Sequence, residues 1–190
     1  MVAEIRGRTR SAAGDWSPGT PPAAVGPRLP FYVVLDNIRS VYNVGSIFRT
    51  SDALRLSHLY LCGMTAYPPH PKLDKTALGA AGHVPWSHAA DAVSVVRDLQ
   101  ERGIPIWACE TGPGADDYLG AEFPAPAAFV FGHEVAGVSP AVLELAERRI
   151  AIPMGGFKAS LNVATAYGVI LFEGMRQLRQ KGIWSPPGKG

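Results

Sequence analysis

The chain has 190 residues, of which 47% are hydrophobic and 18% are charged. This length and composition are typical of one globular domain and exclude an intrinsically disordered chain. The formal net charge of +2 permits a local basic patch but does not by itself indicate a polyanionic partner. Because the chain contains no signal-peptide core and no apolar run of about eighteen residues, we expect a cytoplasmic protein without a membrane partner.

The two ends of the chain have a different composition from the middle. Residues 1–29 are rich in Gly, Pro, Ala and Ser, and residues 183–190 form a short Pro/Gly segment. We therefore expect two flexible ends around one domain at residues 30–182. The first end is either a passive tail or a basic arm that touches phosphates. Its charged residues are Arg6, Arg8, Arg10 and Arg28 against Glu4 and Asp15.

Short apolar runs alternate with amphipathic stretches from Phe31 onward. The expected strands are Phe31–Leu35, His58–Cys62, His83–Trp86, Ile104–Cys109, Ala128–Phe131 and Arg149–Ile152. The expected helices are Val44–Leu54, Lys72–Ala80, Ala89–Arg102, Pro140–Ala146 and Leu161–Lys181. This alternation predicts an α/β fold, with a mostly parallel sheet and helices on both faces. Ligands of such sheets bind beyond the carboxyl ends of the strands.

Polar residues follow the first of these strands. Asn43, Gly45 and Arg49 occur at the spacing N-x-G-x-x-x-R, at the start of the first expected helix. Arg49 stands among apolar residues, so we expect it to meet an anion or a hydrogen-bond acceptor. A structural ion pair is the alternative for this arginine.

Two further loops contain small and polar residues. The sequence WACETGPG brings Glu110 to the end of one strand, and FVFGHEVAGVSP brings Glu134 to the end of another. The second of these loops has Gly137 where a zinc-protease pattern would need a second histidine. The first strand is not followed by the dinucleotide-binding pattern G-x-G-x-x-G, and Gly155–Ser160 lacks the P-loop spacing. The cysteines Cys62 and Cys109 lie in apolar runs and the histidines are scattered, which predicts core thiols and no metal site.

The last expected strand, ending at Ile152, is broken by Pro153 and followed by Gly155 and Gly156. Ser160 is then expected to cap the final helix. Such a loop offers backbone N–H groups and a helix N-terminus to a ligand.

These segments together resemble the SPOUT superfamily of RNA methyltransferases, in the branch named for the tRNA ribose methylase TrmH, also called SpoU. The resemblance covers roughly residues 31–178. The first motif comprises Asn43, Gly45 and Arg49, and the second comprises Gly132, Glu134 and Gly137. The third comprises Ile152, Pro153, Met154, Gly156, Ser160, Leu161 and Asn162.

The resemblance implies a C-terminal deep trefoil knot, a homodimer and the cofactor S-adenosylmethionine. The reaction it implies is transfer of a methyl group to a ribose 2′-hydroxyl of tRNA or rRNA. The implied cofactor-binding residues are Cys109, Glu110, Thr111, Gly112, Gly132, Gly137, Ile152, Met154 and Leu161. No metal is implied.

The resemblance also assigns roles in catalysis. Arg49 would activate the ribose hydroxyl, although arginine holds its proton strongly, so positioning of the hydroxyl or clamping of a phosphate stays open. The other implied catalytic residues are Asn43, Glu134, Ser160 and Asn162.

The sequence departs from this family at Val41 and Tyr42, where members often have Asp-Pro, and at Ala164, where a serine often stands. Many relatives also have an N-terminal RNA-binding domain, and we expect residues 1–29 to be too short to form one. We therefore expect RNA to be selected by the dimer surface, the basic arm, or Arg39, Arg55 and Lys158. Two alternatives stay open: methylation of a base nitrogen, and a catalytically idle RNA-binding dimer.

Overall fold

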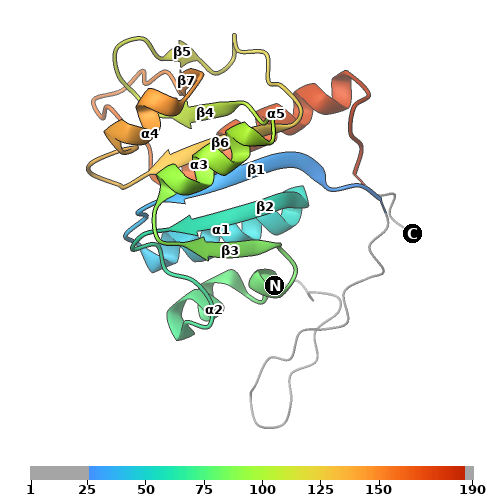
Figure 1. Cartoon of the computed structure of the whole chain (residues 1–190), viewed down its shortest axis with the longest axis vertical. Helices are drawn as coiled ribbons and strands as arrows, with labels where there is room; N and C mark the ends of the chain where they lie inside the picture. The colour runs from blue at the N-terminus through green and yellow to red at the C-terminus, as the bar shows by residue number, and fades with distance from the viewer. Residues whose placement is uncertain (1–25, 187–190) are drawn as a thin grey trace.

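Strand β6 lies in the middle of a seven-stranded sheet, next to β1, in the computed structural model, which describes residues 26–186 (Figure 1). The strands are β1 (Leu29–Asp36), β2 (Leu56–Cys62), β3 (Trp86–Ala89), β4 (Ile106–Cys109), β5 (Asp116–Asp117), β6 (Ala127–Gly132) and β7 (Arg148–Ala151). Their order across the sheet is β3-β2-β1-β6-β4-β7-β5, and all neighbours are parallel. The predicted parallel sheet is therefore confirmed.

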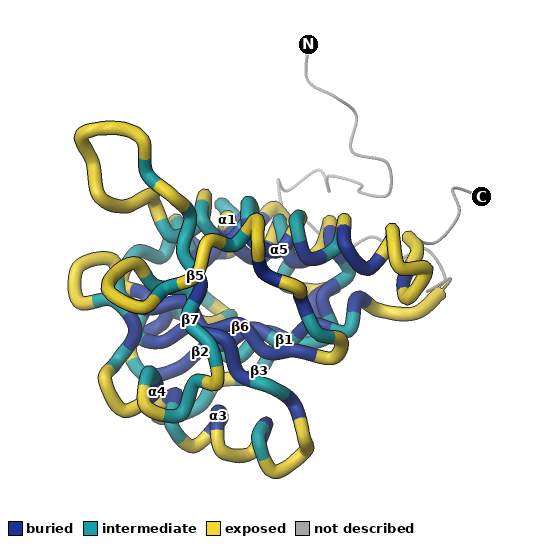
Figure 2. The backbone as a smooth tube through the Cα atoms, turned by 90° about the horizontal axis from the view of Figure 1, so that it is seen from above, coloured by how far each residue is buried: buried dark blue, intermediate teal, exposed yellow. Residues whose placement is uncertain are grey.

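Helices cover both faces of this sheet, as predicted. They are α1 (Val41–Leu54), α2 (Pro71–Ala77), the 3-10 turn η1 (Ala80–Gly82), α3 (Ala92–Glu101), α4 (Pro140–Leu145) and α5 (Val163–Gln180). Figure 2 shows α1 and α5 on one face and α3 and α4 on the other. Side chains alternate along β1: Phe31, Val33 and Leu35 pack on the α1/α5 side, and Val34 packs on the α3/α4 side.

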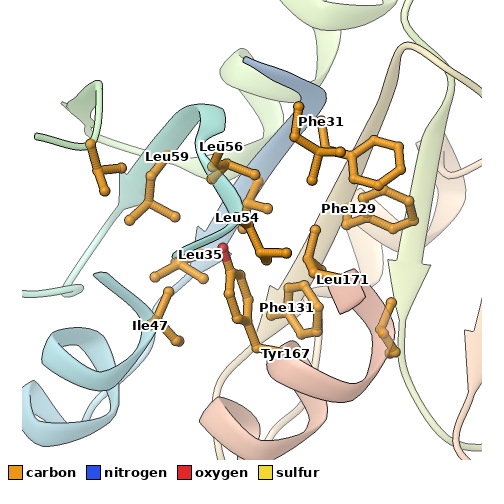
Figure 3. Packing of buried hydrophobic residues seen from close by; sticks show 14 of the residues in the cluster. Phe31, Leu35, Ile47, Leu54, Leu56, Leu59, Phe129, Phe131, Tyr167 and Leu171 are labelled. Carbon is orange, nitrogen blue, oxygen red and sulfur yellow. The ribbon is translucent and has the colours of Figure 1, made fainter. Parts of the chain in front are cut away.

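The core on the α1/α5 side is rich in aromatic residues. Phe31 and Phe129 pack edge to face, with ring centres 5.0 Å apart. Figure 3 shows Tyr167 reaching from α5 into this cluster. Its hydroxyl lies 2.6 Å from the Ser51 hydroxyl of α1, and both residues are fully buried. This bond links the two helices of this face inside the core.

Several element boundaries differ from the prediction. The strand expected at His83–Trp86 is β3, which begins only at Trp86, because His83 N donates to Ala80 O and so caps the end of η1. Helix α3 begins three residues later than expected, since the Asp91 side chain accepts from Ser94 N as its cap. The two-residue strand β5 was not predicted.

The ends of the domain are more ordered than predicted. Trp184 is buried, and its indole N–H donates to Pro27 O at 3.1 Å. The Arg28 guanidinium donates to Leu56 O at 3.0 Å. Residues 26–29 and 183–186 therefore pack onto the domain, whereas residues 1–25 and 187–190 of the expected flexible ends lie outside the described residues.

Within residues 26–186, no helix is both long and apolar enough to cross a membrane. In the same range, no three His, Cys, Asp or Glu side chains are grouped so that they could hold a metal ion. Cys62 and Cys109 are free thiols.

Candidate active site

The carboxyl ends of β1, β6, β4 and β7 meet at one edge of the sheet. Asp36 pairs with Gly132, and Cys109 pairs with Phe131 and Ile150. The loops after β4, β6 and β7, which contain Glu110, Glu134 and Ser160, therefore leave the sheet side by side. They enclose a pocket of about 260 Å³.

Most of the residues predicted to hold a cofactor line this pocket. They are Cys109, Glu110, Thr111, Gly132, Gly137, Ile152, Met154 and Leu161, together with Glu134 and Ser160. Gly112 is absent from the lining. The sequence reasoning missed Val163, Ala166 and Ile170, which line the pocket from α5. Their spacing of three and four residues marks one helix face and is the signal that could have revealed them.

The wall formed by residues 132–137 is a tight turn. His133 N donates to Gly137 O at 2.9 Å, and Gly137 N donates to His133 O at 2.8 Å. A Cβ atom on Gly132 would collide with the backbone of Gly137 and Val138, so no larger residue fits there. Gly137 has φ +73°, which also favours glycine.

Glu110 joins two of the loops. Its Oε2 accepts from Val138 N at 2.8 Å, and its Oε1 accepts from Thr111 N at 3.1 Å. Beside it, burial and then the charge of Glu110 raise the pKa of the Cys109 thiol, so Cys109 contributes a neutral wall rather than a thiolate.

Three predicted catalytic residues form one chain of hydrogen bonds across the three motifs. Asn43 Nδ2 donates to Glu134 Oε1 at 2.9 Å, and Asn162 Nδ2 donates to Asn43 Oδ1 at 3.0 Å. Asn162 Oδ1 accepts from Ala164 N and Thr165 N at the start of α5. The chain therefore runs from the α5 backbone to the Glu134 carboxylate.

The direction of this chain follows from the chemistry of its two ends. An ionised carboxylate can only accept hydrogen bonds, and a backbone N–H can only donate them. Both asparagine amides are therefore oriented in a single way. Each amide nitrogen uses one hydrogen in this chain, so its second hydrogen is available to a ligand oxygen.

Glu134 has further partners in the loop before α1. Its Oε2 accepts from Arg39 N at 2.9 Å, and its Oε1 also accepts from Ser40 N at 3.0 Å. Partial burial raises the pKa of Glu134, but the hydrogen bonds from Arg39, Ser40 and Asn43 outweigh it, and the net pKa is lowered. Glu134 therefore remains ionised at neutral pH and holds the loop rather than accepting a proton.

Arg49 lies apart from these hydrogen-bonded residues. It is exposed on α1, about 9 Å along the helix and about 120° around it from Asn43. Within residues 26–186 it makes no hydrogen bond or ion pair, so the structural ion pair considered from the sequence is not formed in this range.

The predicted cap of the last helix was wrong. The N-cap of α5 is Asn162, and the helix begins at Val163 rather than Leu161. Ser160 is exposed and lines the pocket. Asn162 displaces it as the cap because the Asn162 side-chain oxygen accepts two backbone hydrogen bonds.

The three predicted RNA-binding residues lie in different places. Arg39 lies beside Glu134, and Lys158 lies in the exposed loop after β7, with its Nζ 5.8 Å from the centre of the Phe157 ring. Arg55 follows α1 at the opposite edge of the sheet, where its guanidinium donates to Gly26 O at 3.0 Å. The structure thus brings only Arg39 and Lys158 to the edge that contains the pocket.

Comparison with known proteins agrees with this geometry. The model of the SpoU rRNA methylase family matches residues 30–172. The tRNA (guanosine(18)-2′-O)-methyltransferase of Aquifex aeolicus is 34% identical over 159 residues, which cover 82% of this chain and 73% of that protein. A 23S rRNA (guanosine-2′-O-)-methyltransferase of Vibrio parahaemolyticus is 34% identical over 149 residues, covering 78% of this chain and 60% of that protein.

Solved structures give the same result. The crystal structure of the A. aeolicus TrmH/SpoU tRNA modifying enzyme superposes with a TM-score of 0.77 at 30% identity, covering 87% of this chain and 84% of that one. The SpoU methyltransferase AviRb of Streptomyces viridochromogenes, solved in complex with AdoMet, gives a TM-score of 0.73 at 29% identity, covering 82% and 64%. This chain therefore belongs to the SpoU rRNA methylase family.

Proposed function

We propose that this protein transfers a methyl group from S-adenosylmethionine to a ribose 2′-hydroxyl of tRNA or rRNA. The observation that carries the proposal is the hydrogen-bond chain of Glu134, Asn43 and Asn162 beside the pocket. The relatives named above, which act on a ribose 2′-oxygen of tRNA or rRNA by their names, support the reaction class.

The pocket suits S-adenosylmethionine. Apolar side chains of Ile152, Leu161 and Ile170 line it, and they offer surface for a purine ring. The carboxylates of Glu110 and Glu134 add negative charge, which favours a cofactor with an ammonium and a sulfonium group. When bound, this cofactor supplies a methyl group on a sulfonium, which is a strong methyl donor.

The residues of the hydrogen-bond chain then hold the ribose that accepts the methyl group. The unused amide hydrogens of Asn43 and Asn162 are positioned to donate to a ribose or phosphate oxygen. Glu134 keeps Asn43 in place through their hydrogen bond of 2.9 Å. Alignment of donor and acceptor is a large part of the rate enhancement available to such a reaction. We propose that Arg49 activates or orients the hydroxyl, with Ser160 completing the wall of the pocket.

We also propose that the protein works as a cytoplasmic homodimer. Arg49 of α1 is exposed, and Phe172 of α5 is 44% exposed. These two helices cover the same face of the sheet (Figure 2). A second copy on this face would bury Phe172 and bring new groups to Arg49. The molar mass in solution, measured by light scattering for the wild type and Phe172→Glu, tests this proposal.

The C-terminal trefoil knot is a further proposal, supported by the path of α5. Gln177 Oε1 accepts from Phe123 N, and Gln177 Nε2 donates to Ala121 O, both at 2.9 Å. These bonds hold α5 against the segment that joins β5 to β6.

The test of the reaction is transfer of labelled methyl groups to total tRNA and to rRNA, followed by nucleoside analysis. We expect a 2′-O-methylnucleoside with the wild type and a much lower yield with Arg49→Ala. A methylated base would favour the alternative reaction at a base nitrogen. RNA binding without any methyl transfer would favour the idle RNA-binding dimer.

A further inference from the structure

A second hollow opens beside the pocket. It has a volume of about 430 Å³ and lies between residues 39–43, at the start of α1, and residues 133–135. His133, Glu134 and Val135 line both this hollow and the pocket proposed to hold the cofactor. A ligand in the hollow would therefore lie next to the pocket proposed to hold the cofactor, and Asn43 is part of the lining of the hollow.

Two apolar side chains stand exposed at this hollow. Tyr42 is 60% exposed and Val135 is 85% exposed. Neither belongs to a loose segment: Tyr42 is in the first turn of α1, and Val135 N donates to His133 Nδ1 at 3.0 Å within the tight turn. The hollow thus presents an aromatic ring and an aliphatic group whose backbone positions are fixed by hydrogen bonds.

A positive charge lies at the same hollow. Arg39 is exposed, and its guanidinium makes no hydrogen bond or ion pair within the described part of the chain. The nearby Glu134 carboxylate is occupied by Arg39 N, Ser40 N and Asn43 Nδ2. The guanidinium is consequently available to an anion such as a phosphate.

We infer that Tyr42 stacks on the base of the RNA nucleotide whose ribose receives the methyl group, while Arg39 contacts an adjoining phosphate. An exposed aromatic ring and a guanidinium that has no partner among residues 26–186 line the same hollow. Single-stranded RNA favours this combination, because bases stack on rings and phosphates bind cations. Val135 then bounds the base from the turn. This inference rests on the proposed function and adds how the acceptor nucleotide is held.

The test combines RNA binding and methyl transfer for Tyr42→Ala and Tyr42→Phe. Loss of one base–aromatic stack should weaken RNA binding about 5- to 150-fold for Tyr42→Ala, seen in the Kd and in KM for RNA. Tyr42→Phe keeps the ring and should bind as the wild type does. S-adenosylmethionine affinity should be unchanged in both. Arg39→Gln should reduce the slope of log K against log salt by about 1.

A matched control is Leu119→Ala, which removes another exposed apolar side chain, 63% exposed, away from the hollow. Its RNA affinity should equal that of the wild type. Equal affinity of Tyr42→Ala and wild type would overturn the inference, as would a change in molar mass of Tyr42→Ala, which would make Tyr42 a subunit contact. If the wild type binds RNA without methylating it and Tyr42→Ala binds more weakly, the stacking stands and the proposed reaction fails. A wild type that does not bind RNA overturns both.

Discussion

Asn162 donates a hydrogen bond of 3.0 Å to Asn43 across 119 positions of sequence, and the same side chain caps α5. One residue thus joins the start of α5 to the start of α1. Its two tasks use different atoms: Oδ1 accepts from the α5 backbone, and Nδ2 donates to Asn43. Substitutions can therefore separate them.

Asn162→Asp should keep the cap but lose the link to Asn43. The aspartate oxygen can still accept from Ala164 N and Thr165 N, so the free energy of unfolding should stay within about 0.5 kcal/mol of the wild type. The second oxygen faces the acceptor Asn43 Oδ1 and repels it. We expect methyl transfer to fall about 10- to 100-fold. Urea denaturation and a kcat measurement check the two effects.

Asn162→Ala serves as the comparison, because it removes both the cap and the link. It should cost about 1 kcal/mol of stability in addition to the loss of activity. An Asn162→Asp variant as active as the wild type would contradict a role for the link between Asn162 and Asn43.

The lowered pKa of Glu134 predicts a pH dependence of stability. A carboxyl whose pKa is lower in the folded protein than in the unfolded chain stabilises the fold above its ordinary pKa. That contribution is lost as the pH falls through the lowered value. The difference in stability between wild type and Glu134→Gln should therefore be largest near neutral pH and shrink on acidification. Urea denaturation of both proteins from about pH 7 to about pH 3 measures this difference in stability. A difference that stays constant with pH would contradict the lowered pKa of Glu134.

Two glycines of α5 should respond oppositely to alanine. A Cβ on Gly174 would lie 2.7 Å from Phe31 Cε2 and 2.9 Å from Phe123 Cδ1, so Gly174→Ala should cost about 1–3 kcal/mol through overpacking. A Cβ on Gly168 meets nothing within 4 Å, and Gly168→Ala should gain about 0.5–1 kcal/mol from helix propensity. Thermal and urea unfolding of the two variants check this. A stable Gly174→Ala would mean that the rings of Phe31 and Phe123 move aside easily.

The buried Ser51–Tyr167 pair predicts an asymmetry. Ser51 Oγ donates to Ile47 O at 2.8 Å, so the Tyr167 hydroxyl donates to Ser51. Tyr167→Phe leaves Ser51 with its carbonyl partner and should cost about 1 kcal/mol. Ser51→Ala leaves the buried Tyr167 hydroxyl unsatisfied and should cost about 2–3 kcal/mol. The free energies of unfolding of the two variants test this. A larger loss of stability for Tyr167→Phe than for Ser51→Ala would contradict a hydrogen bond donated by Tyr167 to Ser51.

The sequence periodicity was sufficient to predict the parallel sheet and the loops that meet at its carboxyl edge. Continuous apolar runs such as Phe31–Leu35 are typical of strands in a parallel sheet that is covered on both faces. It was not sufficient for β5, whose residues Asp116 and Asp117 are both exposed and charged and pair only with β7. Nothing in the apolar pattern marks such a strand.

At the candidate site, the residue types were predictable but the connections between them were not. The motifs identified Asn43, Glu134 and Asn162, yet which amide donates to which carboxylate depends on how three distant loops meet. The cap of α5 was misplaced because Ser160 and Asn162 are both good N-cap residues, and only the backbone path decides between them. The exposure of Arg49 was missed because its neighbours Ile47 and Phe48 are buried on another side of α1.

The bond between Trp184 and Pro27 brings both ends of the described chain to the amino-terminal edge of the sheet. The pocket opens at the other edge, and the eight residues of β1 separate the two by about 25 Å. A fluorophore, affinity tag or surface tether attached next to Gly26 or beyond Pro186 would therefore start on the side of the molecule opposite the pocket. A protein attached at Gly26 or Pro186 would therefore have its pocket on the edge that faces the solution.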